Sequence, residues 1–327
     1  MDPLASQPRL LVTRKLPEEV EARIARSYRA EFNGDDRLIG PEELAAIAQA
    51  IEPDGLLVTP TDKMTPEVID ALPGSVKIIA TFSVGYDHIN VPAAAKRGIM
   101  VTNTPDVLTN ATADIALLLM LGAARGAYWG ERMVRENRWG AWSPTHPLGA
   151  DVTGKRLGIY GMGRIGQAVA RRARGFEMEI HYHNRRRLDP AEEQGAIFHQ
   201  TLEDMLPHCD FLSINCASTP ETRGSIDARR IALMPRGAIV VNTARGDIVD
   251  DDALIEALTS GHLLAAGLDV FKGEPAIDPR YRSLENVFLL PHLGSATTAT
   301  RLAMGNRAVD NLDAFFRGER PRDVVHP

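Results

Sequence analysis

Apolar residues along this chain recur in two patterns, short unbroken runs and longer stretches with helical spacing. In the first hundred residues the short runs predict five strands, at 10–13, 29–33, 55–59, 77–81 and 99–102. Helical spacing predicts helices between them, at 17–28, 41–51, 66–72 and 91–97. Regular alternation of strands and helices is typical of a parallel sheet wrapped by helices. We therefore expect an open α/β domain here.

A second series of the same patterns follows. Strands are predicted at 157–160, 179–183, 211–215, 238–242, 265–268 and 287–290, and helices at 167–174, 202–207, 227–234, 250–260 and 297–317. If the last helix packs on the first domain, that domain is discontinuous. We expect two doubly wound, open parallel-sheet domains. A Rossmann cofactor domain (104–292) would be inserted in a smaller, flavodoxin-like substrate domain (1–103 plus 293–327).

Residues 109–137 are predicted to form one long helix, and its middle, 115–121, is apolar on every side. Such a helix must be covered on more than one side. One cover is its own domain, and a second subunit is the other candidate; the alternative is burial wholly within the monomer. The arm that follows, 137–148, carries Trp139 and Trp142. We expect a homodimer that uses the helix and arm at about 109–148.

The clearest motif is Gly161-Met162-Gly163-Arg164-Ile165-Gly166, which stands between a predicted strand and a predicted helix. This is the context that the dinucleotide fingerprint requires. Gly161 permits the tight turn, Gly163 lets the backbone approach a pyrophosphate, and Gly166 lets the helix pack on the strand. The amides at the helix start then face the phosphate charge. The motif predicts a dinucleotide site.

The residues after the next predicted strand indicate which dinucleotide is bound. An NAD site would place an acidic residue about 20 positions beyond the glycines, but the sequence has Asn184-Arg185-Arg186-Arg187. Guanidinium groups can grip a 2′-phosphate, which a carboxylate would repel. We expect NADPH to be preferred, with NADH possible. The alternative is a solvated basic loop.

Composition excludes several other classes of protein. With 37 basic and 43 acidic residues the net charge is −6, which argues against a nucleic-acid or membrane-surface partner. The two cysteines, Cys209 and Cys216, lack the spacing of a metal or disulfide site. The first residues lack the features of a signal peptide, and the longest apolar run, 115–124, is shorter than the roughly 20 residues that a membrane span needs. We expect a cytoplasmic protein with no metal.

Three side chains that can carry chemistry stand where predicted strands end. Arg245 precedes a glycine and could clamp a carboxylate, Glu274 precedes a proline, and His292 lies in a turn. Taken singly they could be a surface ion pair, a solvated acid and a structural histidine. Strand carboxyl ends of an open α/β sheet face the ligand crevice. We therefore expect the three to converge there.

The sequence resembles the D-2-hydroxyacid dehydrogenase family over nearly the whole chain. The matching segments appear in the family's order, at 83–87, 161–166, 242–246, 267–275 and 291–297. The resemblance implies hydride transfer between a nicotinamide and a 2-oxo acid. It implies that Arg245 binds the carboxylate and that His292 gives a proton to the carbonyl oxygen. Glu274 would hold the imidazole oriented and charged.

The resemblance assigns further residues. It implies that the backbone amides of Val84 and Gly85 also bind the substrate carboxylate. Asp269 would meet the nicotinamide amide, and Thr222 would lie beside the cofactor. The family's dimers form through the long helix and arm.

Within the family, the Trp139–Pro144 segment together with 184–186 resembles the NADPH-dependent glyoxylate and hydroxypyruvate reductases. In those enzymes a tryptophan at the position of Trp142 narrows the pocket of the other subunit, which would favour small 2-oxo acids. The alternative is that both tryptophans only pack the interface. Phosphoglycerate dehydrogenase or another member of the family is a second enzyme hypothesis. A dinucleotide-sensing binding protein is the non-enzyme hypothesis.

Overall fold

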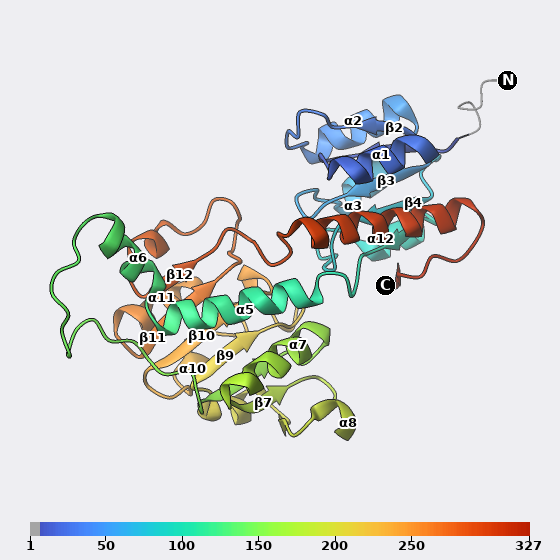
Figure 1. The fold of residues 1–327 in the computed structure, drawn as a ribbon. Coiled ribbons are helices and arrows are strands. Elements are labelled where there is room, and N and C mark those ends of the chain that lie inside the picture. Colours follow the sequence, from blue (N-terminus) through green and yellow to red (C-terminus); the bar gives the residue numbers. More distant parts are fainter. Residues whose placement is uncertain (1–6) are drawn as a thin grey trace. The chain divides into compact units, whose positions relative to one another are not determined.

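The computed structural model describes residues 7–327. The chain divides into two compact units, Met1–Leu108 with Thr297–Pro327 (unit 1) and Thr109–Ala296 (unit 2). Each unit contains a sheet flanked by helices (Figure 1). The predicted fold class, two parallel-sheet α/β domains, is confirmed.

Unit 1 is built on a six-stranded sheet in the order β13-β5-β4-β3-β1-β2. Its strands are β1 (Arg9–Val12), β2 (Arg29–Phe32), β3 (Gly55–Val58), β4 (Ile78–Thr81), β5 (Met100–Thr102) and β13 (Val324–Val325). Its helices are α1 (Glu18–Ser27), α2 (Pro41–Ile51), α3 (Pro66–Ala71), α4 (Val91–Lys96) and α12 (Thr298–Phe316). The first five strands pair in parallel in the flavodoxin-like order 2-1-3-4-5.

The two-residue strand β13, which the apolar pattern did not predict, pairs antiparallel with β5. Helix α12 packs on α1 and β4 of the same unit. Arg23 of α1 forms ion pairs with Asp310 and Asp313 of α12 at 2.7 Å each. The residues after position 296 are therefore part of the unit that begins the chain.

Unit 2 contains a seven-stranded parallel sheet in the order β12-β11-β10-β9-β6-β7-β8. Its strands are β6 (Arg156–Tyr160), β7 (Glu179–His183), β8 (Ile197–His199), β9 (Phe211–Ile214), β10 (Ala238–Asn242), β11 (Leu263–Leu268) and β12 (Val287–Leu289). Counted along the unit, six strands follow the dinucleotide-binding order 3-2-1-4-5-6 and β12 extends it. The edge strand β8 was not predicted.

The helices of unit 2 differ in length from several predictions. They are α5 (Thr109–Ala124), α6 (Ala127–Arg135), α7 (Arg164–Ala173), α8 (Pro190–Glu193), α9 (Leu202–Met205), α10 (Ala228–Ile231) and α11 (Asp251–Thr259). Short 3₁₀ helices occupy Arg174–Phe176, Leu206–His208, Gly246–Ile248 and Pro279–Ser283. The helix predicted at 202–207 ends early as α9 and continues as a 3₁₀ turn.

The single helix predicted over 109–137 is wrong, because α5 and α6 are separate helices bent by 69° at their junction. Gly126 between them has φ 60°, in the left-handed region that ends a helix. A Cβ on Gly126 would also meet the Trp129 indole. Within the described residues no single helix is long and apolar enough to cross a membrane. The bent pair α5 and α6 meets the criterion only when the two helices are taken together, and only by length and composition.

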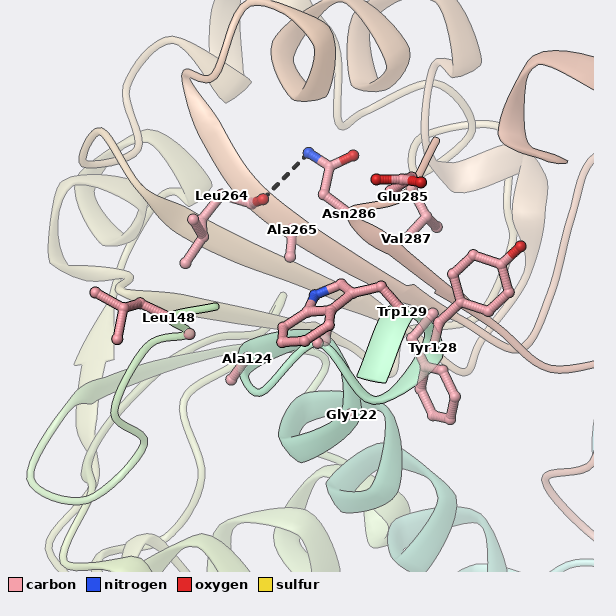
Figure 2. Close-up of a pocket in the computed structure, with 14 residues that line it drawn as sticks. Gly122, Ala124, Tyr128, Trp129, Leu148, Leu264, Ala265, Glu285, Asn286 and Val287 are labelled. Atoms are coloured by element: carbon pink, nitrogen blue, oxygen red, sulfur yellow. Dashed lines mark hydrogen bonds between the residues drawn. The ribbon is translucent and has the colours of Figure 1, made fainter. Parts of the chain in front are cut away.

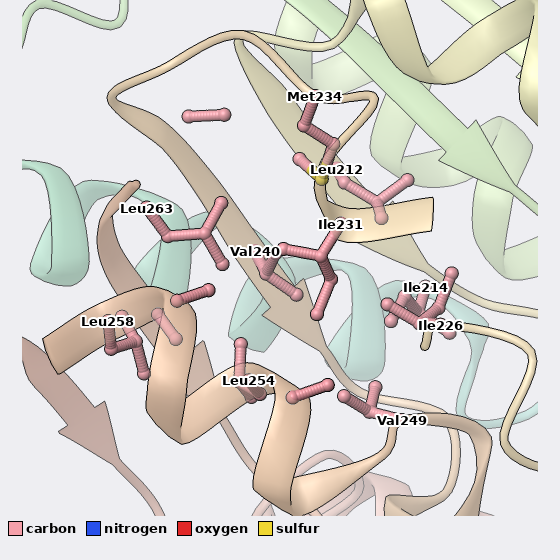
Figure 3. Packing of buried hydrophobic residues seen from close by; sticks show 14 of the residues in the cluster. Leu212, Ile214, Ile226, Ile231, Met234, Val240, Val249, Leu254, Leu258 and Leu263 are labelled. Carbon is pink, nitrogen blue, oxygen red and sulfur yellow. The ribbon is translucent and has the colours of Figure 1, made fainter. Parts of the chain in front are cut away.

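Both faces of the unit 2 sheet carry an apolar core. On β10 alternate side chains point to opposite faces, so Val240 joins one cluster and Val241 the other. Figure 3 shows the first cluster, in which Val240 packs with Leu254 and Leu258 of α11. Helix α5 covers the opposite face, but Leu118 on it is 46% exposed.

Candidate active site

The glycine fingerprint forms the turn between β6 and α7. Gly161 has φ 99°, and a Cβ there would lie 2.4 Å from the Cys216 amide nitrogen in the loop after β9. A Cβ on Gly166 would lie 2.3 Å from the Gly161 carbonyl oxygen. Strands β6 and β9 are neighbours where the strand order reverses, which is where such sheets bind ligands. Both glycines are therefore required by close backbone packing.

Gly163, by contrast, has open space around it. Apart from Gly163 and its two chain neighbours, no residue in the described part of the chain places a heavy atom within 4 Å of a Cβ built at this position. Gly163 stands at the start of α7, where no side chain caps the helix. Arg164 and Ile165 form the first turn of this ten-residue helix. Accessible amides at a helix start suit a phosphate, so the turn fits the pyrophosphate of a dinucleotide.

The next segment, predicted to contact the ribose and its phosphate, divides in the structure. The Asn184 side-chain oxygen accepts a 2.7 Å hydrogen bond from the Met162 amide and so braces the glycine turn. Arg185 and Arg186 are exposed. Arg187 instead binds Glu193 at 2.7 and 3.0 Å, and its guanidinium lies over the Phe198 ring.

Thr222 shapes a loop of unit 2. Its hydroxyl donates to the Ala217 carbonyl at 2.7 Å and accepts from the Thr219 amide at 2.8 Å. The Thr219 hydroxyl, and more weakly Arg185, lower the pKa of Glu221 in this loop.

Arg245 lies in the turn after β10. A Cβ on the following Gly246 would lie 1.9 Å from the Phe271 carbonyl carbon, so this turn packs directly on the segment that leads to Glu274. Asn242, which is buried, holds the turn from inside. Its side chain donates to the Arg245 carbonyl at 2.9 Å and accepts from the Ala244 amide at 3.0 Å. No role was expected for Asn242 from the sequence, although an amide at the end of a predicted strand was the available signal.

Glu274 and His292 form a hydrogen-bonded pair. His292 Nδ1 lies 2.8 Å from Glu274 Oε2, with the side chains 43% and 33% exposed. The other carboxylate oxygen, Oε1, accepts from the Phe271 amide at 2.7 Å. Burial alone would raise the pKa of Glu274. The hydrogen bond with His292 and smaller contributions together outweigh burial, so this pKa lies below its ordinary value. The pair leaves His292 Nε2 as the ring nitrogen for another partner.

Asp269 holds the turn that carries His292. Its carbonyl accepts from the His292 amide at 2.9 Å, and its carboxylate accepts from the Leu293 and Gly294 amides at 2.6 and 2.8 Å. His292 itself has φ 56°, a strained conformation for this residue type that its surroundings must maintain. Burial raises the pKa of Asp269. Unit 2 thus places Arg245, Glu274 and His292 in the segments that follow the carboxyl ends of β10, β11 and β12.

The other predicted site residues lie on separate loops. Val84 and Gly85 are half-buried in the unit 1 loop after β4. Trp142 is 83% exposed on the arm of unit 2.

An open pocket lies at the opposite end of the unit 2 strands. Figure 2 shows Trp129 and Leu148 beside it, with Leu264 and Val287 from the first residues of β11 and β12. These are the amino ends of the strands, so this pocket is separate from the Glu274–His292 pair.

A dinucleotide-binding sheet with an acid–histidine pair at its strand ends defines a nicotinamide-dependent oxidoreductase. Residues 117–294 match the family described as D-isomer specific 2-hydroxyacid dehydrogenase, NAD binding domain. The chain belongs to this family and is an enzyme of the D-2-hydroxyacid dehydrogenase type, which confirms the resemblance seen in the motifs.

Several relatives align with nearly the whole chain. A glycerate dehydrogenase of Hyphomicrobium methylovorum is 46% identical over 96% of this chain and 97% of its own. A glyoxylate reductase of Pyrococcus horikoshii is 42% identical over 98% and 96%. The solved NADPH-dependent glyoxylate/hydroxypyruvate reductase of Sinorhizobium meliloti, in complex with NADP and malonate, is 36% identical with a TM-score of 0.88, covering 98% of this chain and 97% of that one.

Proposed function

We propose that this enzyme reduces small 2-oxo acids, glyoxylate and hydroxypyruvate, to their 2-hydroxy acids with NADPH. The observation that carries the proposal is the 2.8 Å Glu274–His292 pair in a turn held by Asp269. The turn that bears Arg245 packs on the same segment. The names of the relatives support this substrate class, since glycerate is the reduced form of hydroxypyruvate.

In this reaction the residues divide the work by charge. Arg245 binds the substrate carboxylate through charge-assisted hydrogen bonds. The bound nicotinamide supplies the hydride. His292 donates the proton from Nε2 to the carbonyl oxygen, which develops negative charge as the hydride arrives. Glu274 fixes the ring orientation through Nδ1 and stabilises the protonated imidazole. We also assign to the Val84 and Gly85 amides a role in binding the carboxylate.

The preference for NADPH is part of the proposal. Arg185 and Arg186 are exposed after β7, where their guanidinium groups can bind a 2′-phosphate. Asn184 supplies no negative charge at this position, and it supports the glycine turn. Thr222 and Asp269 would contact the cofactor from loops whose shape they also maintain. NADH remains usable because the pyrophosphate site does not depend on these arginines.

We further propose that the enzyme is a homodimer. Large apolar side chains are exposed on α6 and the arm that follows: Val134 at 62%, Trp139 at 69%, Trp142 at 83% and Leu148 at 72%. A monomer rarely exposes so many of them together. Trp142 of the partner subunit would narrow the substrate pocket and favour acids with two or three carbons.

The test is a panel of 2-oxo acids of increasing size, each assayed with NADPH and with NADH. We expect the highest kcat/KM with NADPH and with glyoxylate or hydroxypyruvate. The His292→Ala variant should lose kcat by about a thousandfold while it keeps its Kd for NADPH. His262→Ala is the matched control, because the His262 ring hydrogen-bonds the Ile231 carbonyl, away from the strand carboxyl ends. Binding of NADPH with no turnover of any 2-oxo acid would contradict the proposal and favour a binding protein.

A further inference from the structure

In the unit 1 loop after β4, two consecutive carbonyl groups accept hydrogen bonds from the same neighbouring segment. The Ser83 carbonyl accepts from the Thr104 amide at 2.8 Å, and the Val84 carbonyl accepts from the Asn103 side-chain amide at 2.8 Å. Both donors belong to the segment that follows β5. Two consecutive peptide groups are thus fixed by two consecutive residues.

This arrangement determines where the amides point. In a trans peptide the C=O of one residue and the N–H of the next point in opposite directions, and both peptides here are trans. The Val84 and Gly85 amides therefore point away from Asn103 and Thr104. Within residues 7–327 neither amide has a hydrogen-bond acceptor. Adjacent amides presented in this way suit an anionic oxygen.

Asn103 is in turn fixed by residues from the end of unit 1. Its amide donates to the Asp323 carbonyl at 3.2 Å. Its carbonyl accepts from the Asn311 side-chain amide at 3.1 Å. Asn311 lies on α12 and is 2% exposed. The direction of the Asn103 side chain therefore depends on α12 and on the segment after it.

A buried ion pair holds that segment. Arg307 of α12 binds both carboxylate oxygens of Asp323, at 2.5 and 2.9 Å. Asn311 donates to the same carboxylate at 3.1 Å and accepts from the Asp323 amide at 3.3 Å. The Asp323 side chain is only 4% exposed. The next two residues form β13, which pairs with β5 immediately before Asn103.

We propose that Asn103 is a positioning residue for the substrate carboxylate, and that Asp323 is the buried anchor that sets it. Asn103 orients the Val84–Gly85 peptide so that its amide faces the ligand, and Asp323 with Arg307 and Asn311 orients Asn103. This inference rests on the proposed function, in which the two amides bind the carboxylate of a 2-oxo acid. It makes residues after α12 determinants of substrate affinity.

The test is the steady-state kinetics of Asn103→Ala with glyoxylate and NADPH. Loss of one partly buried hydrogen bond that orients the amide should raise KM for glyoxylate about tenfold. The value of kcat and the Kd for NADPH should stay within about twofold, since the loop provides binding rather than proton transfer. Asn33→Ala is the matched control. Asn33 also donates to two carbonyls of unit 1, those of Thr13 and Arg37, at 2.8 and 2.7 Å.

The inference fails if KM in Asn103→Ala equals that of the wild type, or if Asn33→Ala raises KM equally. If the wild type reduces glyoxylate and Asn103→Ala has the same KM, the proposed function stands and only the positioning role is overturned. If the wild type reduces no 2-oxo acid, the proposed function fails. The crystal structure of Asn103→Ala then decides the positioning role, because an unchanged Val84–Gly85 peptide would overturn it.

Discussion

The carboxyl ends of the two parallel sheets carry different kinds of binding group. In unit 2 they present titratable side chains, of which Glu274 and His292 form a pair at 2.8 Å. In unit 1 the Val84–Gly85 loop presents backbone amides, and the Val84 carbonyl and the carbonyl before it accept neutral hydrogen bonds from Asn103 and Thr104. A charged site is tuned by pH and salt, whereas a backbone site is tuned by geometry. Perturbing the two should therefore give different kinetic signatures.

Among the variants that compare the two units, Glu274→Gln should produce the largest effect. The carboxylate is charged at neutral pH, because the hydrogen bond with His292 and smaller contributions together keep the pKa of Glu274 below its ordinary value, although burial alone would raise it. The same hydrogen bond fixes the orientation of the imidazole ring. Removing the charge should lower kcat for reduction about a hundredfold near neutral pH. The deficit should shrink at acidic pH, because the wild-type Glu274 carboxylate is itself protonated as the pH falls through its lowered pKa and so loses the charge that the variant lacks. The measurement is the pH profile of kcat.

Glu285→Gln is the matched control for this prediction, since Glu285 is an exposed acid of the same unit beside the separate pocket. The Asn103→Ala variant completes the comparison, because its effect on KM should not vary with pH over the same range. A deficit of Glu274→Gln that stays constant with pH would show that Glu274 only packs the loop.

The second prediction concerns three consecutive arginines. Replacing Arg185 and Arg186 together by Ala should weaken NADPH binding about thirtyfold and leave NADH binding nearly unchanged. Added salt should reduce the difference between the two cofactors, because these side chains are exposed. Arg187→Ala is the control, since Arg187 is bound to Glu193 and should affect the stability of the fold instead. The measurement is fluorescence titration of each variant with each cofactor. Equal losses for NADPH and NADH would contradict the assignment.

Sequence patterns predicted most of the fold because strands buried on both faces leave unbroken apolar runs. The run at 238–242 became β10 without change. Two kinds of element were not visible. Strands β8 and β13 are three and two residues long and lie at sheet edges, where pairing rather than composition defines them. The break at Gly126 was also missed, because a glycine inside a helical pattern predicts only a weak helix.

The candidate site shows the same division. Arg245, Glu274 and His292 could be predicted because reactive side chains at strand ends are unusual and matched a family pattern. The contacts of Asn242, Asn103 and Asp323 could not, because an amide or carboxylate that supports backbone looks like any other polar residue in sequence. Arg187 could not be separated from its neighbours, since its partner Glu193 lies on α8, which the pattern did not reveal.

The smallest expected effect is that of Asp323→Asn, which tests how far the Val84–Gly85 loop depends on the buried Asp323 carboxylate. Asp323→Asn keeps the shape of the side chain but removes the charge that Arg307 binds at 2.5 and 2.9 Å. Arg307 then loses its buried counter-ion, so the free energy of unfolding should fall. The Asn103 backbone amide can still donate to the carbonyl of residue 323, because this hydrogen bond does not use the side chain. The Val84–Gly85 loop should therefore be displaced less than in Asn103→Ala. KM for glyoxylate should rise only about threefold, independently of pH.

An unchanged KM in a measurably destabilised Asp323→Asn variant would confine the role of Asp323 to stability. A KM increase equal to that of Asn103→Ala would instead show that the two residues act as a single unit.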